Sequence, residues 1–458
     1  MNRSSRWVEA ALVVVAIAVR IATVLVLQSH EVPRSTYEHG EIAANLLAGR
    51  GFSVRFLGAE GPTSQQAPVY PWMVAAAYAV GGVETPLALL CLQVAQGLLG
   101  GLMTAGVIRL ARRLVPASPL VAWGAGLIAA LHPTLVYSAT HVQVASVAAV
   151  LVVWLLELSA RGAEVGTAGS AAAAGALLGV LALTDPILAL GGLGMLASFH
   201  IDAPRGVRHL GRTLRLGLVA LAVASLVVLP WTIRNFLVHG ELVAIKSTFG
   251  YAFWQGNCAL SEGTDKVVRP SVNRALRHAG PAGGLANWNR TLWEARHTAG
   301  YLDDIALSPE DYRQLAALSE PARSRLLFRR ALNDLAQQPG RYLGLCLRRL
   351  RYFWLFDETN PKSRVLVYRV SHLGLTALAV ISLAVAGGEV RRRLVPSLIV
   401  AACLAAFHSL TIVSARFHVP IEPLMAIWAA SGLTRFDRPL LGVFHHPRRL
   451  TTSKASGS

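Results

Sequence analysis

Charged residues are scarce in this sequence. They make up 15% of its 458 residues, whereas 53% are hydrophobic. Acids are the scarcest, with 25 Asp and Glu against 43 Lys and Arg, which gives a formal net charge of +18. A soluble globular protein carries about 25% charged residues. The composition therefore excludes an ordinary soluble protein and predicts an all-α, polytopic membrane protein.

The sequence also lacks the common motifs for nucleotides and metals. It contains no P-loop, dinucleotide fingerprint, HExxH or GxSxG, so phosphate hydrolysis is not encoded as an energy source. The arginines form short clusters between apolar runs, which argues against a nucleic-acid partner. The four cysteines have no metal-ligand spacing. Cys258 and Cys346 share the one long hydrophilic segment, where a disulfide and unpaired thiols both stay open.

The apolar runs predict about ten membrane spans with both termini in the cytoplasm. One apolar run, residues 68–82, is too short for a span and rich in interfacial aromatic residues. If it does not cross, every arginine cluster falls on the same side as Met1, as the positive-inside rule requires. The predicted spans are residues 7–28, 86–109, 118–138, 143–160, 166–184, 186–202, 214–231, 366–388, 394–413 and 419–434.

These spans divide the chain into four parts. Residues 1–231 form a transmembrane module with a first outer loop at 29–84, which we expect to hold two interfacial helices. Residues 232–364 form an extracytoplasmic segment, whose helical periodicity at 309–353 predicts a small lid or platform. Residues 365–434 return to the membrane, and 435–458 form a basic cytoplasmic tail. The expected location is the cell (inner) membrane, with the functional site on the extracytoplasmic side.

Acidic residues gather in the first outer loop, in the stretch YEHGEIAANLLAGRGF. On a helix, Glu38, Glu41 and Asn45 fall in one polar wedge opposite an apolar face. This pattern predicts a helix that lies in the membrane interface. Two interpretations stay open, since the acids either point at a substrate or only meet water.

Three more clusters belong to the same outer side. Arg234 follows a predicted span, where a guanidinium can hold a lipid phosphate or extend to the headgroups. The stretch STFGYAFWQGN, ending at Asn257, combines aromatics and amides and suits sugar recognition. The stretch ARFHVPIEP begins the last span and contains Arg416. Asp185, between two spans, either caps the next helix or faces a cavity.

As an ordered series, these blocks carry a family resemblance. YEHGEIAANLLAGRGF, GPTSQQAPVYPW, PWTIRNFLVHG, FGYAFWQGN, PGRYLGLCLRRLRYFW and ARFHVPIEP resemble bacterial membrane glycosyltransferases of the GT-C fold, family 39 type. That group includes the protein O-mannosyltransferases and the lipid A aminoarabinose transferases. The resemblance implies a polyprenyl-phosphate-linked sugar as donor and a lipid, glycan or protein as acceptor. It also implies an acidic residue in the first outer loop as base or metal ligand, which falls on Glu38 and next on Glu41.

The chain departs from the family pattern at two points. The family's acid in the first loop aligns with Ser35 instead of Glu38, and the second outer loop has His141 and Gln143 where the family has another acid. A divalent cation is therefore poorly supported there, because one carboxylate and an amide make a weak site.

In the chemistry that the resemblance implies, Arg234, Lys246 or Arg416 stabilises the donor phosphate while Glu38 accepts the acceptor proton. A transporter or flippase and a catalytically lapsed scaffold are the alternatives. The two halves of the sequence show no inverted repeat, which argues against a transporter. The candidate substrate-binding residues are Tyr37, Gln65, Gln66, Tyr70, His141, Gln143, Asn235, Trp254, Asn257, His418 and Glu422.

Overall fold

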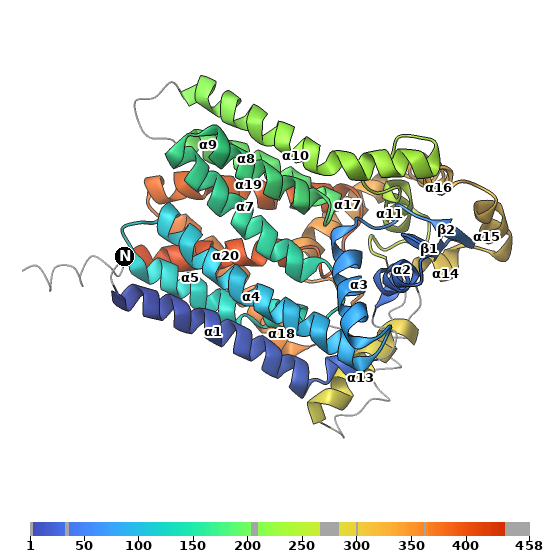
Figure 1. Ribbon diagram of the computed structural model, residues 1–458, viewed down its shortest axis with the longest axis horizontal. Coiled ribbons are helices and arrows are strands. Elements are labelled where there is room, and N and C mark those ends of the chain that lie inside the picture. Colours follow the sequence, from blue (N-terminus) through green and yellow to red (C-terminus); the bar gives the residue numbers. More distant parts are fainter. Residues whose placement is uncertain are drawn as a thin grey trace, which may run out of the picture.

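A bundle of helices running in alternating directions forms the larger part of the molecule (Figure 1). The computed structural model describes residues 3–32, 36–202, 209–265, 284–298, 301–360, 363 and 365–435. Ser35 and almost all of the predicted basic tail lie outside these residues. Six described helices are long and apolar enough to cross a membrane, which confirms a multi-pass membrane protein. They are α1 (Arg3–Val26), α4 (Pro86–Leu114), α7 (Ala145–Val165), α10 (His209–His239), α18 (Leu366–Val385) and α19 (Gly388–Leu410).

The other four predicted spans are shorter helices or broken ones, so the count of ten stays a prediction. Pro133 cannot donate a backbone hydrogen bond and divides the span at 118–138 into α5 (Pro119–Leu131) and α6 (Pro133–Ser138). The next two are α8 (Ala168–Ala182) and α9 (Gly191–Ile201), with the 3-10 turn η2 (Pro186–Leu190) before α9. The last comprises η4 (Val419–Ile421), α20 (Glu422–Ala430) and η5 (Ser431–Arg435).

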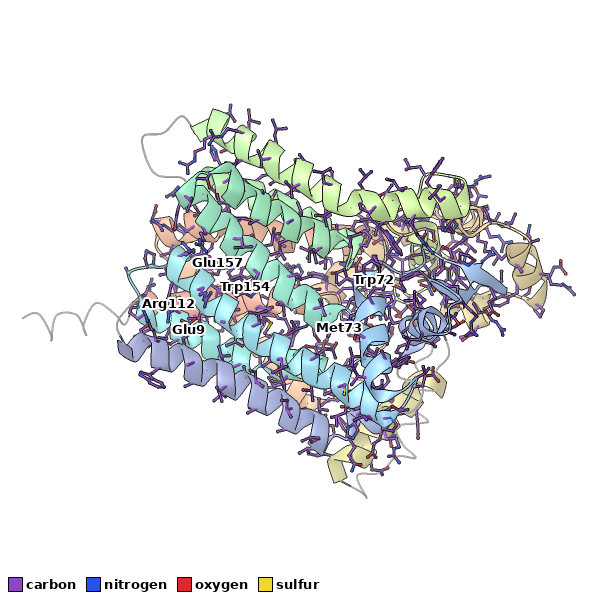
Figure 2. The ribbon with its side chains drawn as sticks, in the orientation of Figure 1. Glu9, Trp72, Met73, Arg112, Trp154 and Glu157 are labelled. Atoms are coloured by element: carbon purple, nitrogen blue, oxygen red, sulfur yellow. The ribbon has the colours of Figure 1, made fainter. Side chains whose placement is uncertain are left out.

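One end of the bundle collects arginine clusters, and we call it the basic end. Figure 2 shows Glu9 on α1 near Arg112 on α4, and their side chains form an ion pair at 2.5 Å. Further along the chain, Arg393 donates to the carbonyl of Arg113 on α4 at 3.2 Å. Clusters that are distant in sequence thus share one end, as the positive-inside argument requires. Which side of the membrane this end faces stays a prediction.

The opposite end, which we call the loop end, carries smaller elements from two segments (Figure 1). The first segment contributes α2 (Tyr37–Leu47) and α3 (Val69–Gly81), which are the two expected helices, and in addition the 3-10 turn η1 (Ser29–Glu31). The second is helical, as its periodicity predicted. It contains α11 (Phe249–Asn257), α13 (Gly284–Thr298), α14 (Leu302–Ala306), α15 (Pro309–Ala316), α16 (Glu320–Gln337) and α17 (Pro339–Trp354).

The first outer loop also contains an antiparallel hairpin that the sequence did not predict. Strand β1 (Ser53–Phe56) pairs with β2 (Ala59–Pro62), with Val54 opposite Gly61. The connecting residues Leu57 and Gly58 both have positive φ, at 50° and 84°. Tight hairpin turns require positive φ, which Asn-Gly or Asp-Gly usually provides. Leucine at the first position removes that sequence signal.

Helix α10 is longer than the predicted span at 214–231. It continues through Pro230 to His239, so Arg234 and Asn235 lie within a helix and not beyond its end. Its 31 residues extend from the basic end into the loop end. In its last two turns Asn235 is buried inside the loop end, whereas Ile233, Phe236 and Leu237 are exposed.

Candidate active site

A cavity of about 480 Å³ opens at the loop end of the bundle. Elements distant in sequence surround it: the start of α2, the hairpin, the turns at residues 142–145 and 184–188, helix α11 and the segment at 416–420. Eight of the predicted site residues line it: Tyr37, Glu38, Glu41, Gln65, Gln66, Gln143, Lys246 and Arg416. The first-loop acids and two of the three predicted cations therefore share one cavity.

Glu38 is held at the cavity by a short chain of hydrogen bonds. Its Oε1 accepts from Nε2 of Gln66 at 2.7 Å. Oε1 of the same glutamine accepts from Nζ of Lys246 at 3.1 Å. The amide thereby fixes the distance between the carboxylate and the ammonium group and keeps them from a direct ion pair. Both charged groups remain on the cavity wall.

The electrostatics keep Glu38 ionised at neutral pH. Burial would raise the pKa of its carboxyl, but His39, its backbone hydrogen bond, Arg416 and Lys246 together lower the pKa below its ordinary value of 4.5. His39 contributes only when it is protonated, and burial lowers its own pKa to about 4. Near neutral pH the two permanent cations Arg416 and Lys246 are therefore the side-chain charges that stabilise the carboxylate.

Glu41 lies one helical turn after Glu38 and has a different partner. Its Oε1 accepts a hydrogen bond of 2.7 Å from the backbone N–H of Arg55 on β1. The Arg55 guanidinium pairs instead with Glu60 across the hairpin at 3.1 Å. Glu41 therefore attaches the hairpin to α2, in addition to lining the cavity.

Helix α11 divides the predicted sugar-binding stretch between two faces. Tyr251 and Gln255, one turn apart, line the cavity, and Nε2 of Gln255 donates to the Tyr251 hydroxyl at 2.7 Å. Trp254 and Asn257 are buried on other faces of the helix and are absent from the cavity lining. Composition alone predicts one continuous binding stretch, but helical periodicity brings only every third or fourth residue to the cavity.

Three aspartates on the cavity wall were not among the predicted site residues: Asp185, Asp265 and Asp303. Asp185 caps η2, its Oδ1 accepting from the N–H of Ile187 at 3.4 Å, and it also lines the cavity. Both of its proposed roles are therefore present. Asp303 lies 3.4 Å from Gln255 Nε2, and burial raises the pKa of its carboxyl. No sequence signal marked Asp303, because it lies in a helix of only five residues.

Two amides offer unused polar atoms at the same cavity. Oε1 of Gln65 and Nε2 of Gln143 are buried without a hydrogen-bond partner. One is an acceptor and the other a donor, so together they can bind a hydroxyl-rich molecule.

Tyr37, at the start of α2, has a φ of 50°, an uncommon value for a bulky residue. Its ring lies 6.3 Å from that of Trp293.

Known proteins resemble this chain in structure and not detectably in sequence. No family model and no curated protein sequence matches it. The archaeal oligosaccharyltransferase AglB from Archaeoglobus fulgidus, solved with an inhibitory peptide and a dolichol-phosphate, is similar with a TM-score of 0.51 and 14% identity, over 98% of this chain and 53% of AglB. The apo form of that enzyme is similar with a TM-score of 0.50 and 13% identity, over 97% of this chain and 53% of the enzyme. This chain has the GT-C fold.

The chain spans about half the length of the AglB structures that it matches. ArnT from Cupriavidus metallidurans bound to undecaprenyl phosphate is also similar, with a TM-score of 0.44 and 18% identity, over 96% of this chain and 79% of ArnT.

Arg234 of this GT-C chain does not line the cavity. Its guanidinium donates to the carbonyls of Thr63 and Phe52 at 2.5 and 3.0 Å and lies 4.9 Å from the centre of the Trp231 ring. The neighbouring Asn235 is fully buried and donates to backbone carbonyls at residues 243 and 245. Both side chains attach the first outer loop and the following turn to α10.

Three other predicted residues also form internal contacts. The Tyr70 hydroxyl donates to Oε1 of Gln96 at 2.9 Å inside the bundle. Nδ1 of His141 lies 3.1 Å from the carbonyl of Tyr137, and its ring packs against Tyr137 and Trp293. Asn257 donates to the carbonyls of Phe253 and Thr411 at 2.8 and 3.1 Å.

His418 and Glu422 lie outside the cavity lining, beside two histidines that the sequence did not connect with them. Glu422 is fully buried, and His132, His372 and His418 surround its carboxylate. The atoms of His132, His372 and Glu422 are close enough together to hold a metal ion. The four cysteines form no disulfide, so of the two alternatives for Cys258 and Cys346, the structure has free thiols.

Proposed function

We propose that this chain is a membrane glycosyltransferase that moves a sugar from a polyprenyl-phosphate donor to an acceptor hydroxyl on the extracytoplasmic face of the cell membrane. The GT-C fold supports this class, because AglB shares the fold and was solved with a dolichol-phosphate. A cavity at the end of the bundle opposite the arginine clusters supports the location. The acceptor class, whether lipid, glycan or protein, follows only from the resemblance of the sequence blocks.

The arrangement of Glu38, Gln66 and Lys246, with Arg416 on the same wall, carries this proposal. A donor phosphate is an anion that needs cations, and Lys246 and Arg416 are available to it. The acceptor needs a base, and the lowered pKa of Glu38 keeps its carboxylate deprotonated at neutral pH, the form in which it can accept a proton. One wall thus offers the two kinds of group that the reaction requires.

The proposed reaction is a single displacement at the anomeric carbon of the sugar. Glu38 takes the proton of the acceptor hydroxyl as its oxygen forms a bond to that carbon. The bond from the same carbon to the phosphate oxygen breaks, and the electron pair leaves with the polyprenyl phosphate. Lys246 and Arg416 stabilise the charge that develops on the leaving phosphate. Gln65 and Gln143, with their unused polar atoms, would bind sugar hydroxyls.

The test uses the full chain, purified and reconstituted in lipid bilayers. Polyprenyl-phosphate-linked sugars are supplied with radiolabel in the sugar, and loss of the label from the lipid-linked donor is followed. We expect consumption of a lipid-linked sugar and none of nucleotide sugars. Uptake of a solute into proteoliposomes without donor consumption would favour the transporter alternative. Mass spectra of lipid extracts from a deletion strain and its parent would identify a lipid acceptor.

A further inference from the structure

A buried carboxylate surrounded by three imidazoles lies inside the bundle, apart from the proposed chemistry. Oε1 of Glu422 is 3.1 Å from Nδ1 of His372 and 3.0 Å from Nδ1 of His418, and Oε2 is 3.7 Å from Nε2 of His132. The side chains are between 0 and 5% exposed, so water cannot compensate the charge. Among the described residues, no arginine or lysine lies within 4.0 Å of this carboxylate.

The hydrogen bonds around the cluster leave lone pairs facing one another. Nε2 of His372 lies 3.2 Å from the carbonyl of Trp354, which can only accept, so this nitrogen carries the proton. In the neutral ring, Nδ1 then presents a lone pair to the Glu422 oxygen at 3.1 Å. This contact is a hydrogen bond only when a proton lies between the two atoms, and without one the two acceptors need another cation.

Three other atoms of the cluster are unsatisfied. Nε2 of His132, Nδ1 of His418 and Oε2 of Glu422 are buried and make no hydrogen bond. Nδ1 of His418 is 3.0 Å from the carboxylate and still lacks hydrogen-bond geometry. One proton between His372 and Glu422 would satisfy that contact and leave the nitrogens of His132 and His418 without a partner, whereas a metal ion accepts lone pairs from His132, His372 and Glu422 together.

We propose that His132, His372 and Glu422 bind one divalent transition-metal ion, Zn²⁺ by preference, with His418 beside them. Two imidazole nitrogens disfavour Mg²⁺ and Ca²⁺, which take oxygen ligands. The ligand atoms of His132, His372 and Glu422 lie within 4.8 Å of one another, close enough to share one ion. The carbonyl of Trp354 orients the ring of His372, and the Tyr368 hydroxyl, 3.1 Å from Nε2 of His418, orients the neighbouring ring.

This site is structural, because its three ligands are buried away from the cavity lining and His418 lies beside them where a substrate would have to enter. The ligands come from the junction of α5 and α6, from α18, and from the segment leading into α20. The ion would connect three parts of the chain that are distant in sequence. Arg416, Phe417 and Pro420 of the last segment line the cavity, so the ion would also fix the position of Arg416.

The test measures metal content in the full chain, purified without chelator from zinc-supplemented cells. We expect about one Zn²⁺ per chain, and at least about a tenfold loss of bound metal in Glu422→Gln and in His372→Gln. His239→Gln is the matched control, because His239 is also a buried histidine 3.8 Å from a buried carboxylate, that of Glu320. It should keep its full metal content.

A melting experiment and a spectroscopic one complete the test. Chelator should lower the melting temperature of the wild type, and added Zn²⁺ should restore it. If the ligand variants fail to fold, Co²⁺-loaded wild type decides, since a four-coordinate ion gives intense visible bands. A wild type without metal and without a melting shift on Zn²⁺ addition would overturn the proposal. The proposal would also be overturned by full metal content in Glu422→Gln, by an equal loss of bound metal in the His239→Gln control, or by a Co²⁺ spectrum typical of six-coordination.

Discussion

The Glu38 carboxylate accepts a hydrogen bond of 2.7 Å from the Gln66 side-chain amide. The amide cannot give up its proton, so this contact orients the carboxylate without neutralising it. Because Gln66 also binds Lys246, the position of the proposed base depends on the position of a proposed phosphate ligand. This coupling is the basis of the first two predictions.

Glu38→Gln should lower the transfer rate by about 10²-fold or more, because an amide keeps the shape of the side chain but cannot accept a proton. Donor binding should change little. The measurement is turnover of a polyprenyl-phosphate-linked sugar together with donor binding. Glu41→Gln is the matched control on the next turn, and its smaller effect should come from a weaker hold on the hairpin. Nearly full activity in Glu38→Gln would require another base.

Activity should persist at acidic pH. The base works when deprotonated, and the pKa of Glu38 is lowered, so activity should fall only as pH drops below the ordinary glutamate value of 4.5. The same lowered pKa contributes stability above the unfolded-state value, and this stability is lost as pH falls through the folded-state value. Lys246→Met removes one of the lowering charges and should move the acidic limb of the rate profile to higher pH. An unchanged limb in this variant would contradict the electrostatic account.

Arg416→Gln and Arg234→Gln should separate phosphate binding from stability. Arg416 lines the cavity, so its loss should raise KM for the lipid-linked donor. Arg234 instead donates to the carbonyls of Thr63 and Phe52, so its loss should cost about 1 to 3 kcal/mol in the free energy of unfolding with little change in KM. Thermal unfolding and donor titration on both variants measure the two effects. A higher KM from Arg234→Gln alone would reverse the assignment.

Gly256→Ala should destabilise the loop end, because the added Cβ would lie 2.1 Å from the Thr411 carbonyl oxygen. Overpacking of this kind costs about 1 to 3 kcal/mol. Gly344→Ala on α17 is the control, since nothing lies within 4 Å of its added methyl group. Replacing a helical glycine by alanine there should stabilise by up to about 1 kcal/mol. Equal melting temperatures for the two variants would contradict the close packing of α11.

Reporter fusions after Gly61 and after Ala317 should both report the extracytoplasmic side, and fusions after Arg113 and Arg393 the cytoplasmic side. The reason is the collection of arginine clusters at the basic end. Opposite sides for Gly61 and Ala317 would mean that the run at 68–82 crosses the membrane.

The parts that the sequence predicted are those encoded by local periodicity. The apolar runs gave the alternating helices, and the polar wedge on α2 led to Glu38 at the cavity. Asp303 could not be found in the same way, because only the folded chain brings it beside Gln255. His132 and His372 are more than two hundred residues apart and share no motif, so their meeting at Glu422 depends on how three helices pack.

Two of the predicted amides show a second way in which the sequence-based prediction of the site was wrong. Asn235 and Asn257 have the chemistry of sugar-binding residues, yet both donate to backbone carbonyls of the protein itself. A polar residue between apolar runs has two uses, binding a ligand and satisfying the backbone. Residue type does not separate them, because the choice depends on which face of a helix the residue occupies.

The length of α10 determines how far an acceptor has to travel. Its 31 residues extend about 46 Å at 1.5 Å per residue, whereas the hydrocarbon core of a bilayer is about 30 Å thick. Roughly 16 Å of helix is left over, enough to pass through a headgroup layer. If one end of α10 starts at the membrane surface, the loop end that α10 supports would stand at the level of the headgroups and just above them. Under the proposed function, an acceptor would then reach the cavity without entering the hydrocarbon, while the prenyl chain of the donor would stay dissolved in it.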